Sequence, residues 1–129
     1  MGSLAKASIN RLLAKALARL APPELKLSEI SFKDLPLYSY DYDADYPPTA
    51  KAFKDAIAHS DAVLFVTPEY NRSIPGGLKN AIDWASRPGG KISFVRKPSA
   101  VIGTSPAQSA PRSHSSSSAA CSASATRPR

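Results

Sequence analysis

The chain has 129 residues, 43% of them hydrophobic, with a formal net charge of +7 and a single cysteine, Cys121. This length allows one domain, and a lone cysteine excludes an internal disulfide, so we expect a cytoplasmic protein. No apolar run reaches the ~18 residues of a membrane helix, and no secretory signal is recognisable, so we expect no membrane partner.

The first predicted element is a helix over residues 9–20, followed by a short strand. The apolar residues have helical spacing; they are Ile9, Leu13, Ala16, Leu17 and Leu20. Ser8 or Asn10 is expected to cap the start, and Pro22-Pro23 ends the run. Leu25 and Leu27 then alternate with polar residues, which predicts the strand.

The middle of the chain predicts a loop, a helix and a buried strand. Residues 34–48 are rich in Tyr, Asp and Pro and form the loop. The helix runs from about Thr49 to His59, with Phe53 and Ile57 on one face. Residues 62–66 are continuously apolar, which predicts a strand buried on both faces.

A third helix is predicted over residues 76–86, with Trp84 in the core, and another apolar strand over residues 99–103. Helices that alternate with short apolar strands predict an α/β fold with a parallel sheet. In such sheets ligands bind beyond the carboxyl ends of the strands. Two loops are placed there, and both lead into a helix.

Residues 2–10 form the first loop, which offers hydroxyls, an amide and backbone N–H groups at a helix start. This chemistry suits a phosphate, although Ser8 as a simple helix cap is an equally good interpretation. The loop has neither Gly-Lys-Ser/Thr nor Gly-x-Gly-x-x-Gly. A nucleoside-triphosphate loop is therefore excluded, and a Rossmann dinucleotide site is unsupported.

Residues 68–77 form the second loop, in which prolines fix the backbone and glycines let a flat ligand approach. Tyr70 either stacks on a ring or supports the loop, and Asn71 tolerates unusual dihedral angles. The alternative is an ordinary helix entry without a ligand.

Three stretches, "GSLAKASIN", "TPEYNRSIPGGLKNAIDWASRP" and "KPSAVIGTSP", resemble the NADPH-dependent FMN reductase family, which includes bacterial chromate and quinone reductases. The resemblance covers Gly2 to Pro106. It implies a flavodoxin-like three-layer sandwich with a parallel sheet, bound FMN, and electron transfer from NAD(P)H to a small-molecule acceptor such as a quinone, flavin or metal. It also implies a homo-oligomer, a dimer or a tetramer.

The resemblance also implies which residues hold FMN. Those at the phosphate are Gly2, Ser3, Leu4, Lys6, Ser8 and Asn10. Those at the flavin ring are Pro68, Glu69, Tyr70 and Asn71, and Thr104 and Ser105 complete the cofactor site. No catalytic side chain and no metal ligand is expected, because hydride transfer is the chemistry of the cofactor.

The chain departs from the family pattern at three places. Ala5 and Ala7 stand where the phosphate loop of the family has Arg and Gly, and the strand that precedes this loop is missing. After Pro106, a reading shifted by one base restores the family's Gly-Ala-Ile-Gly-Thr-Ala. We therefore interpret residues 1–106 as a partial domain that lacks its first strand and its C-terminal strand and helix. Residues 107–129 are interpreted as a disordered, out-of-frame tail, and an inactive fragment is one alternative.

Two alternatives belong to other functional classes. A flavodoxin-type electron carrier would bind FMN without NAD(P)H activity, but such carriers are usually acidic. An RNA- or membrane-binding role for the Ser/Arg tail is the other. The tail contributes three arginines and no acid, leaving +4 for the rest of the chain. No nucleic-acid reader motif accompanies this charge, so no nucleic-acid partner is expected.

Overall fold

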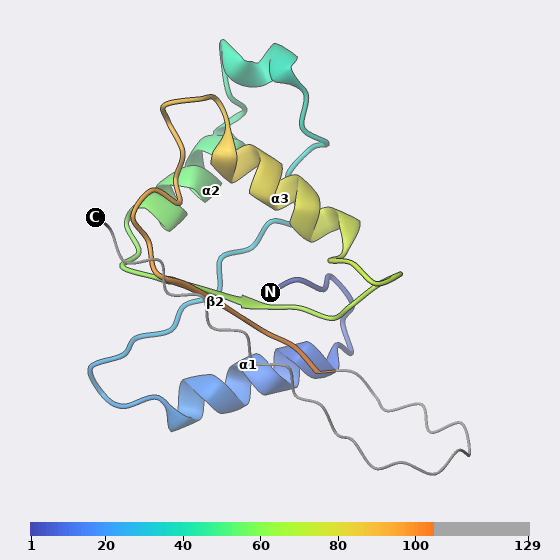
Figure 1. Cartoon of the computed structure of the whole chain (residues 1–129), viewed down its shortest axis with the longest axis vertical. Coiled ribbons are helices and arrows are strands. Elements are labelled where there is room, and N and C mark those ends of the chain that lie inside the picture. Colours follow the sequence, from blue (N-terminus) through green and yellow to red (C-terminus); the bar gives the residue numbers. More distant parts are fainter. Residues whose placement is uncertain (105–129) are drawn as a thin grey trace.

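The computed structural model describes residues 1–104, in which three α-helices accompany a two-stranded sheet (Figure 1). In chain order the elements are α1 (Ile9–Leu20), a 3₁₀ turn (Tyr40–Asp43), α2 (Pro48–Ala58), β1 (Val63–Val66), α3 (Gly76–Ser86) and β2 (Ser99–Ile102). The three predicted helices are confirmed. Ser105 and the predicted tail lie outside the described residues.

The sheet is parallel, with Val63 opposite Ser99 and Val66 opposite Ile102. The Val63 N–H donates to Pro98 O at 3.0 Å and the Thr67 N–H to Ile102 O at 2.9 Å, so the ladder continues past both ends. Helix α1 lies on one side of the strands, and α2 and α3 lie on the other (Figure 1). The predicted three-layer α/β arrangement with a parallel sheet is therefore confirmed.

Two strand predictions are wrong. Leu25 and Leu27 belong to an extended loop, because no strand among residues 1–104 lies beside them to form a ladder. Strand β1 is not buried on both faces: Val66 is buried, but Leu64 is 37% exposed. In the described part of the chain β1 has a strand neighbour on one edge only, which leaves more of its surface accessible.

The core lies between α2, α3 and the loop over residues 34–48. Trp84 is completely buried, as predicted, and the rings of Tyr38, Tyr42 and Tyr46 surround it with centroids 5.2, 5.4 and 5.1 Å away. Its indole Nε1 donates to Pro36 O at 2.8 Å, which ties the loop to α3. Phe53 and Ile57 of α2 are buried in the same cluster, as their spacing predicted.

A lysine closes the end of α3. The Lys54 ammonium donates to the carbonyl oxygens of Trp84 at 3.3 Å and Lys91 at 2.9 Å, and also to that of Arg87. Burial lowers the pKa of Lys54. The carbonyl oxygens replace the water that the ammonium loses, and the ammonium in turn satisfies the carbonyls at the helix end, where a cation is favoured.

No helix in residues 1–104 is both long and apolar enough to span a bilayer.

Candidate functional site at the carboxyl end of the sheet

Three segments that are distant in the sequence meet where β1 ends: residues 1–10, 67–71 and 103–104. The Gly2 N–H donates to Val66 O at 2.7 Å, which places the first loop beside the last residue of β1. Strand β2 pairs with the other edge of β1, and Gly103 and Thr104, which follow β2, lie at the same end of the sheet. This is the end of a parallel sheet at which ligands bind.

Two glycines allow this close approach. A Cβ atom on Gly2 would lie 2.2 Å from Thr67 Oγ1, and one on Gly103 would lie 2.1 Å from the backbone oxygen of Thr67. Real Cβ atoms do not come this close, so neither position accepts a side chain without movement. Thr67 is itself buried and donates its hydroxyl proton to Pro68 O at 3.0 Å. The backbone of Thr67 is therefore held between the two glycines.

Asn10 joins the first loop to the end of β2. Its Nδ2 donates to Thr104 O at 2.9 Å and its Oδ1 accepts the Thr104 N–H at 2.9 Å, and the residue is only 1% exposed. Of the two residues expected to cap α1, Ser8 is the N-cap residue and Asn10 lies inside the helix. Ser8 occupies the cap position without a side-chain cap bond, and the Asn10 amide is paired with Thr104 instead.

We expect Asn10→Ala to lower the free energy of unfolding by about 1–2 kcal/mol, because two hydrogen bonds to Thr104 are lost. The loss is moderate because Thr104 is exposed and its backbone groups can bond water instead. Lys6→Ala on the same loop is the matched control, since Lys6 is exposed and makes no ion pair within residues 1–104. Thermal unfolding followed by circular dichroism measures both. Equal stability of the two variants would show that the Asn10–Thr104 pair does not hold the loop.

The start of α1 is suited to an anion. The first turn holds no acidic residue, and Ser8 is half-buried beside it. Within residues 1–104 the backbone N–H groups of Leu4, Lys6 and Ala7 donate no hydrogen bond, while that of Ala5 donates to Ser3 Oγ at 3.2 Å. N–H groups at a helix start, together with the helix dipole, attract negative charge.

The second loop is a tight turn. The Tyr70 N–H donates to Ser73 O at 2.8 Å and the Ser73 N–H donates to Tyr70 O at 2.9 Å. Between them Asn71 and Arg72 have φ angles of 50° and 59°. These values confirm that Asn71 adopts an unusual backbone conformation. The turn uses the backbone of Tyr70 and leaves the residue 50% exposed.

The rest of this loop divides into an exposed edge and a packed helix start. Glu69 is exposed and Pro68 half-buried, so both stand at the accessible end of β1. A Cβ atom on Gly76 would meet nothing within 4 Å, whereas one on Gly77 would lie 3.3 Å from Phe32 and 3.6 Å from Leu4. Gly77 thus lets Phe32 pack closely against the start of α3, with Leu4 at an ordinary contact distance, and Gly76 leaves open space.

The structure therefore brings together the predicted residues of both loops and Thr104. Sequence reasoning missed Thr67 and Gly103 as site residues. Their signal was position: each follows an apolar strand directly, at the carboxyl end where ligands bind. In the described part of the chain no group of three or more His, Cys, Asp or Glu side chains is arranged to hold a metal ion.

Comparison with known proteins gives a family match and several relatives. The family model described as NADPH-dependent FMN reductase matches residues 1–122. A 2-hydroxy-1,4-benzoquinone reductase from Burkholderia is 56% identical over 105 residues, covering 81% of this chain and 57% of that protein. A quinone reductase from Pseudomonas putida is 57% identical over 107 residues, covering 82% of this chain and 58% of the relative.

Among solved structures, the flavoenzyme NAD(P)H:(acceptor) oxidoreductase FerB from Paracoccus denitrificans is similar, with a TM-score of 0.77 and 55% identity. The match covers 81% of this chain and 57% of that structure. The chain therefore spans less than three-fifths of the length of these three relatives.

Proposed function

Because the chain belongs to the NADPH-dependent FMN reductase family, with the flavodoxin-like fold over the part that it covers, we propose that the loops at the end of β1 bind FMN. The corresponding activity is NAD(P)H-dependent reduction of a small-molecule acceptor such as a quinone, a flavin or a metal. The observation that carries this proposal is the meeting of residues 2–10, the Thr67 segment and Gly103-Thr104 around one strand end.

The first loop supplies the phosphate end of the site. Backbone N–H groups of Leu4, Lys6 and Ala7, the Ser8 hydroxyl and the Lys6 ammonium are the available donors. Ser3 is buried and its hydroxyl accepts the Ala5 N–H, so Ser3 shapes the loop. Asn10 is buried against Thr104, and its second Nδ2 hydrogen is the donor it can direct to a phosphate.

The second loop supplies the ring end. Within residues 1–104 the backbone N–H groups of Glu69 and Asn71 donate no hydrogen bond, so they can serve the polar edge of a flavin. The exposed Tyr70 ring is an aromatic surface beside them. The Tyr70–Ser73 turn holds these groups in place.

Held by these loops, FMN would supply the redox chemistry that links a nicotinamide hydride donor to the acceptor. The chain's contribution is to bind and orient: Gly2 and Gly103 fix the strand ends, the start of α1 neutralises the phosphate, and the turn holds the ring edge. A homo-oligomeric assembly stays a prediction from the family resemblance. The domain boundary at Pro106 also stays a prediction, since the family match continues to residue 122.

Titration with FMN and with riboflavin tests the site, because riboflavin lacks the phosphate. We expect Ser8→Ala to weaken FMN binding by about tenfold, the size of a hydrogen bond to a charged group, and to leave riboflavin binding unchanged. Tyr70→Ala should weaken both ligands. The control is Ser31→Ala, an exposed serine on another segment. Quenching of flavin fluorescence measures all three variants.

Equal affinity of the protein for FMN and riboflavin, or no affinity for either up to millimolar ligand, would contradict the assignment of the two loops. Mixing the flavin-loaded protein with NADH or NADPH in a stopped-flow instrument then tests the activity. Bleaching of the flavin absorbance supports a reductase. Binding of FMN without bleaching by either nicotinamide supports the electron-carrier alternative.

A further inference from the structure

The residue that follows strand β1 has a buried hydroxyl group beside the proposed ring site. Thr67 is only 8% exposed, and its hydroxyl donates to Pro68 O at 3.0 Å. Within residues 1–104 the Pro68 carbonyl accepts no other hydrogen bond. The orientation of this carbonyl therefore depends on a single side-chain contact.

The Pro68 carbonyl belongs to the same peptide unit as the Glu69 N–H. The pyrrolidine ring fixes the φ angle of Pro68, so rotation about its ψ angle is the motion that turns this unit. In a planar trans peptide the C=O and N–H bonds point in opposite directions. Because Thr67 holds Pro68 O, the Glu69 N–H is turned away from Thr67. It donates no hydrogen bond within residues 1–104 and is available to a ligand.

The backbone on either side of this peptide unit is fixed by other bonds. The Thr67 N–H donates to Ile102 O at 2.9 Å and continues the ladder of the sheet. The Tyr70 N–H donates to Ser73 O at 2.8 Å and closes the turn. The peptide unit between Pro68 and Glu69 has neither support, which leaves the Thr67 hydroxyl to orient it.

The Thr67 side chain is held in its own position by the first loop. A Cβ atom on Gly2 would lie 2.2 Å from Thr67 Oγ1 and 2.4 Å from its Cβ atom. The backbone of Gly2 therefore packs directly on this side chain and leaves it little room to turn. The same residue thus contacts the phosphate loop and orients the backbone of the ring loop.

We propose that the Thr67 hydroxyl is a positioning group for the flavin ring, because it keeps the Glu69 N–H ready to donate to an acceptor atom at the ring edge. This inference rests on the proposed function, since it assigns a role within the same site. Thr67 acts through the backbone of Pro68 and Glu69 and is not a catalytic residue. A donor that is oriented before the ligand arrives lowers the cost of ordering on binding.

Two substitutions separate the hydroxyl of Thr67 from its packing. Thr67→Val keeps the branched shape and loses the hydroxyl, whereas Thr67→Ser keeps the hydroxyl and loses the methyl group. We expect Thr67→Val to weaken FMN and riboflavin binding by the same factor, about fivefold, the size of one hydrogen bond. Thr67→Ser should bind both flavins as the unsubstituted chain does. Quenching of flavin fluorescence measures all four affinities, and a role in packing alone would reverse the pattern.

Hydrogen exchange followed by NMR gives a second measurement, which does not require a variant to fold. In the unsubstituted chain, saturating riboflavin should slow exchange at the Glu69 amide more than at the Tyr70 amide, because the Tyr70 N–H is already bonded to Ser73 O. In Thr67→Val at saturating riboflavin, the added protection of the Glu69 amide should be smaller.

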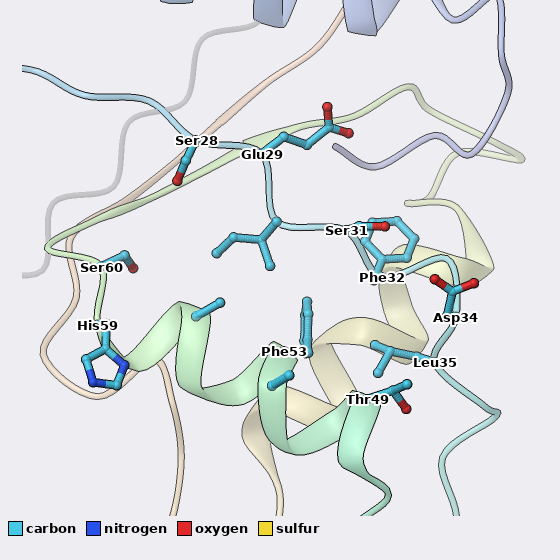
Figure 2. Close-up of a pocket in the computed structure, with 13 residues that line it drawn as sticks. Ser28, Glu29, Ser31, Phe32, Asp34, Leu35, Thr49, Phe53, His59 and Ser60 are labelled. Carbon is cyan, nitrogen blue, oxygen red and sulfur yellow. The ribbon is translucent and has the colours of Figure 1, made fainter.

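A cavity elsewhere in the chain requires a control, because a flavin ring that entered it would also change in fluorescence. The cavity has a volume of about 650 Å³ and lies between α2 and residues 28–35, with Phe53 pointing into it (Figure 2). Thr67, Pro68 and Glu69 do not line it, whereas Ala56 does. Ala56→Trp should therefore leave flavin binding unchanged.

Three results would overturn the inference and leave the proposed function in place. They are equal flavin affinity of Thr67→Val and the unsubstituted chain, weaker binding by Thr67→Ser than by Thr67→Val, and no added protection of the Glu69 amide by riboflavin. Loss of flavin binding in Ala56→Trp would place the flavin in the cavity and overturn both. Absence of flavin binding by the unsubstituted chain would overturn the proposed function and this inference with it.

Discussion

Gly103→Ala should lower the free energy of unfolding by about 3 kcal/mol, at the upper end of what overpacking usually costs. The added methyl group would lie 2.1 Å from the backbone oxygen of Thr67, and backbone in a ladder cannot move aside as a flexible side chain can. Separation of Gly103 from Thr67 would also pull Thr104 from Asn10. Thermal unfolding should show a fall of roughly 12 °C or more.

Gly76→Ala is the matched control for Gly103→Ala. A Cβ atom at Gly76 meets nothing within 4 Å, and the residue is the first of helix α3. Alanine is the better helix former, so we expect unchanged or slightly increased stability, by up to ~1 kcal/mol. If Gly103→Ala were as stable as Gly76→Ala, the close approach of the two strand ends would not be required, and the proposed site would lose its support.

Trp84→Ala should be at least as damaging, with a loss of about 3–5 kcal/mol, the range for removing a large aromatic side chain from a core. Trp84 is completely buried and contacts three tyrosine rings. Typical domains have only ~5–15 kcal/mol of stability, so this loss takes a large share of it. Denaturant unfolding monitored by circular dichroism measures the change.

Trp84→Phe separates the ring from its hydrogen bond. Phenylalanine keeps most of the apolar contact but loses the Nε1 bond to Pro36 O, an oxygen that the Asn80 amide still contacts at 2.9 Å. We expect a loss of about 1–1.5 kcal/mol. A loss as large as that of Trp84→Ala would show that the hydrogen bond, and not the aromatic packing, holds the loop over residues 34–48 on α3.

Both substitutions change how the proposed site is held in place. The Gly103 substitution acts directly on the strand end, whereas the Trp84 substitution acts on the layer of α2 and α3 behind the sheet. FMN added in excess should therefore raise the unfolding temperature of a Trp84 variant in which the strand ends remain in place, because a ligand that binds only the folded state stabilises it.

The sequence by itself determined the helices and predicted where the proposed site lies. Apolar spacing in residues 9–20, 49–59 and 76–86 defined three helices because the 3.6-residue period is a local property of the backbone. The apolar runs before Thr67 and Gly103 defined two strands, and parallel sheets bind ligands where such strands end. The loop motifs at residues 2–10 and 68–77 identified the family, which the comparisons confirmed.

The tertiary structure decided which backbone and side-chain groups pair. Asn10 was expected as a possible helix cap, and its amide instead bonds Thr104, 94 residues away in the chain. Likewise, Leu25 and Leu27 have the alternation of a strand but form none, and Leu64 is partly exposed within an apolar run. A strand exists only when a neighbour completes its ladder, and full burial of a strand requires neighbours at both of its edges as well as elements on both faces. Periodicity in one segment cannot report either condition, because both depend on what lies beside it in space.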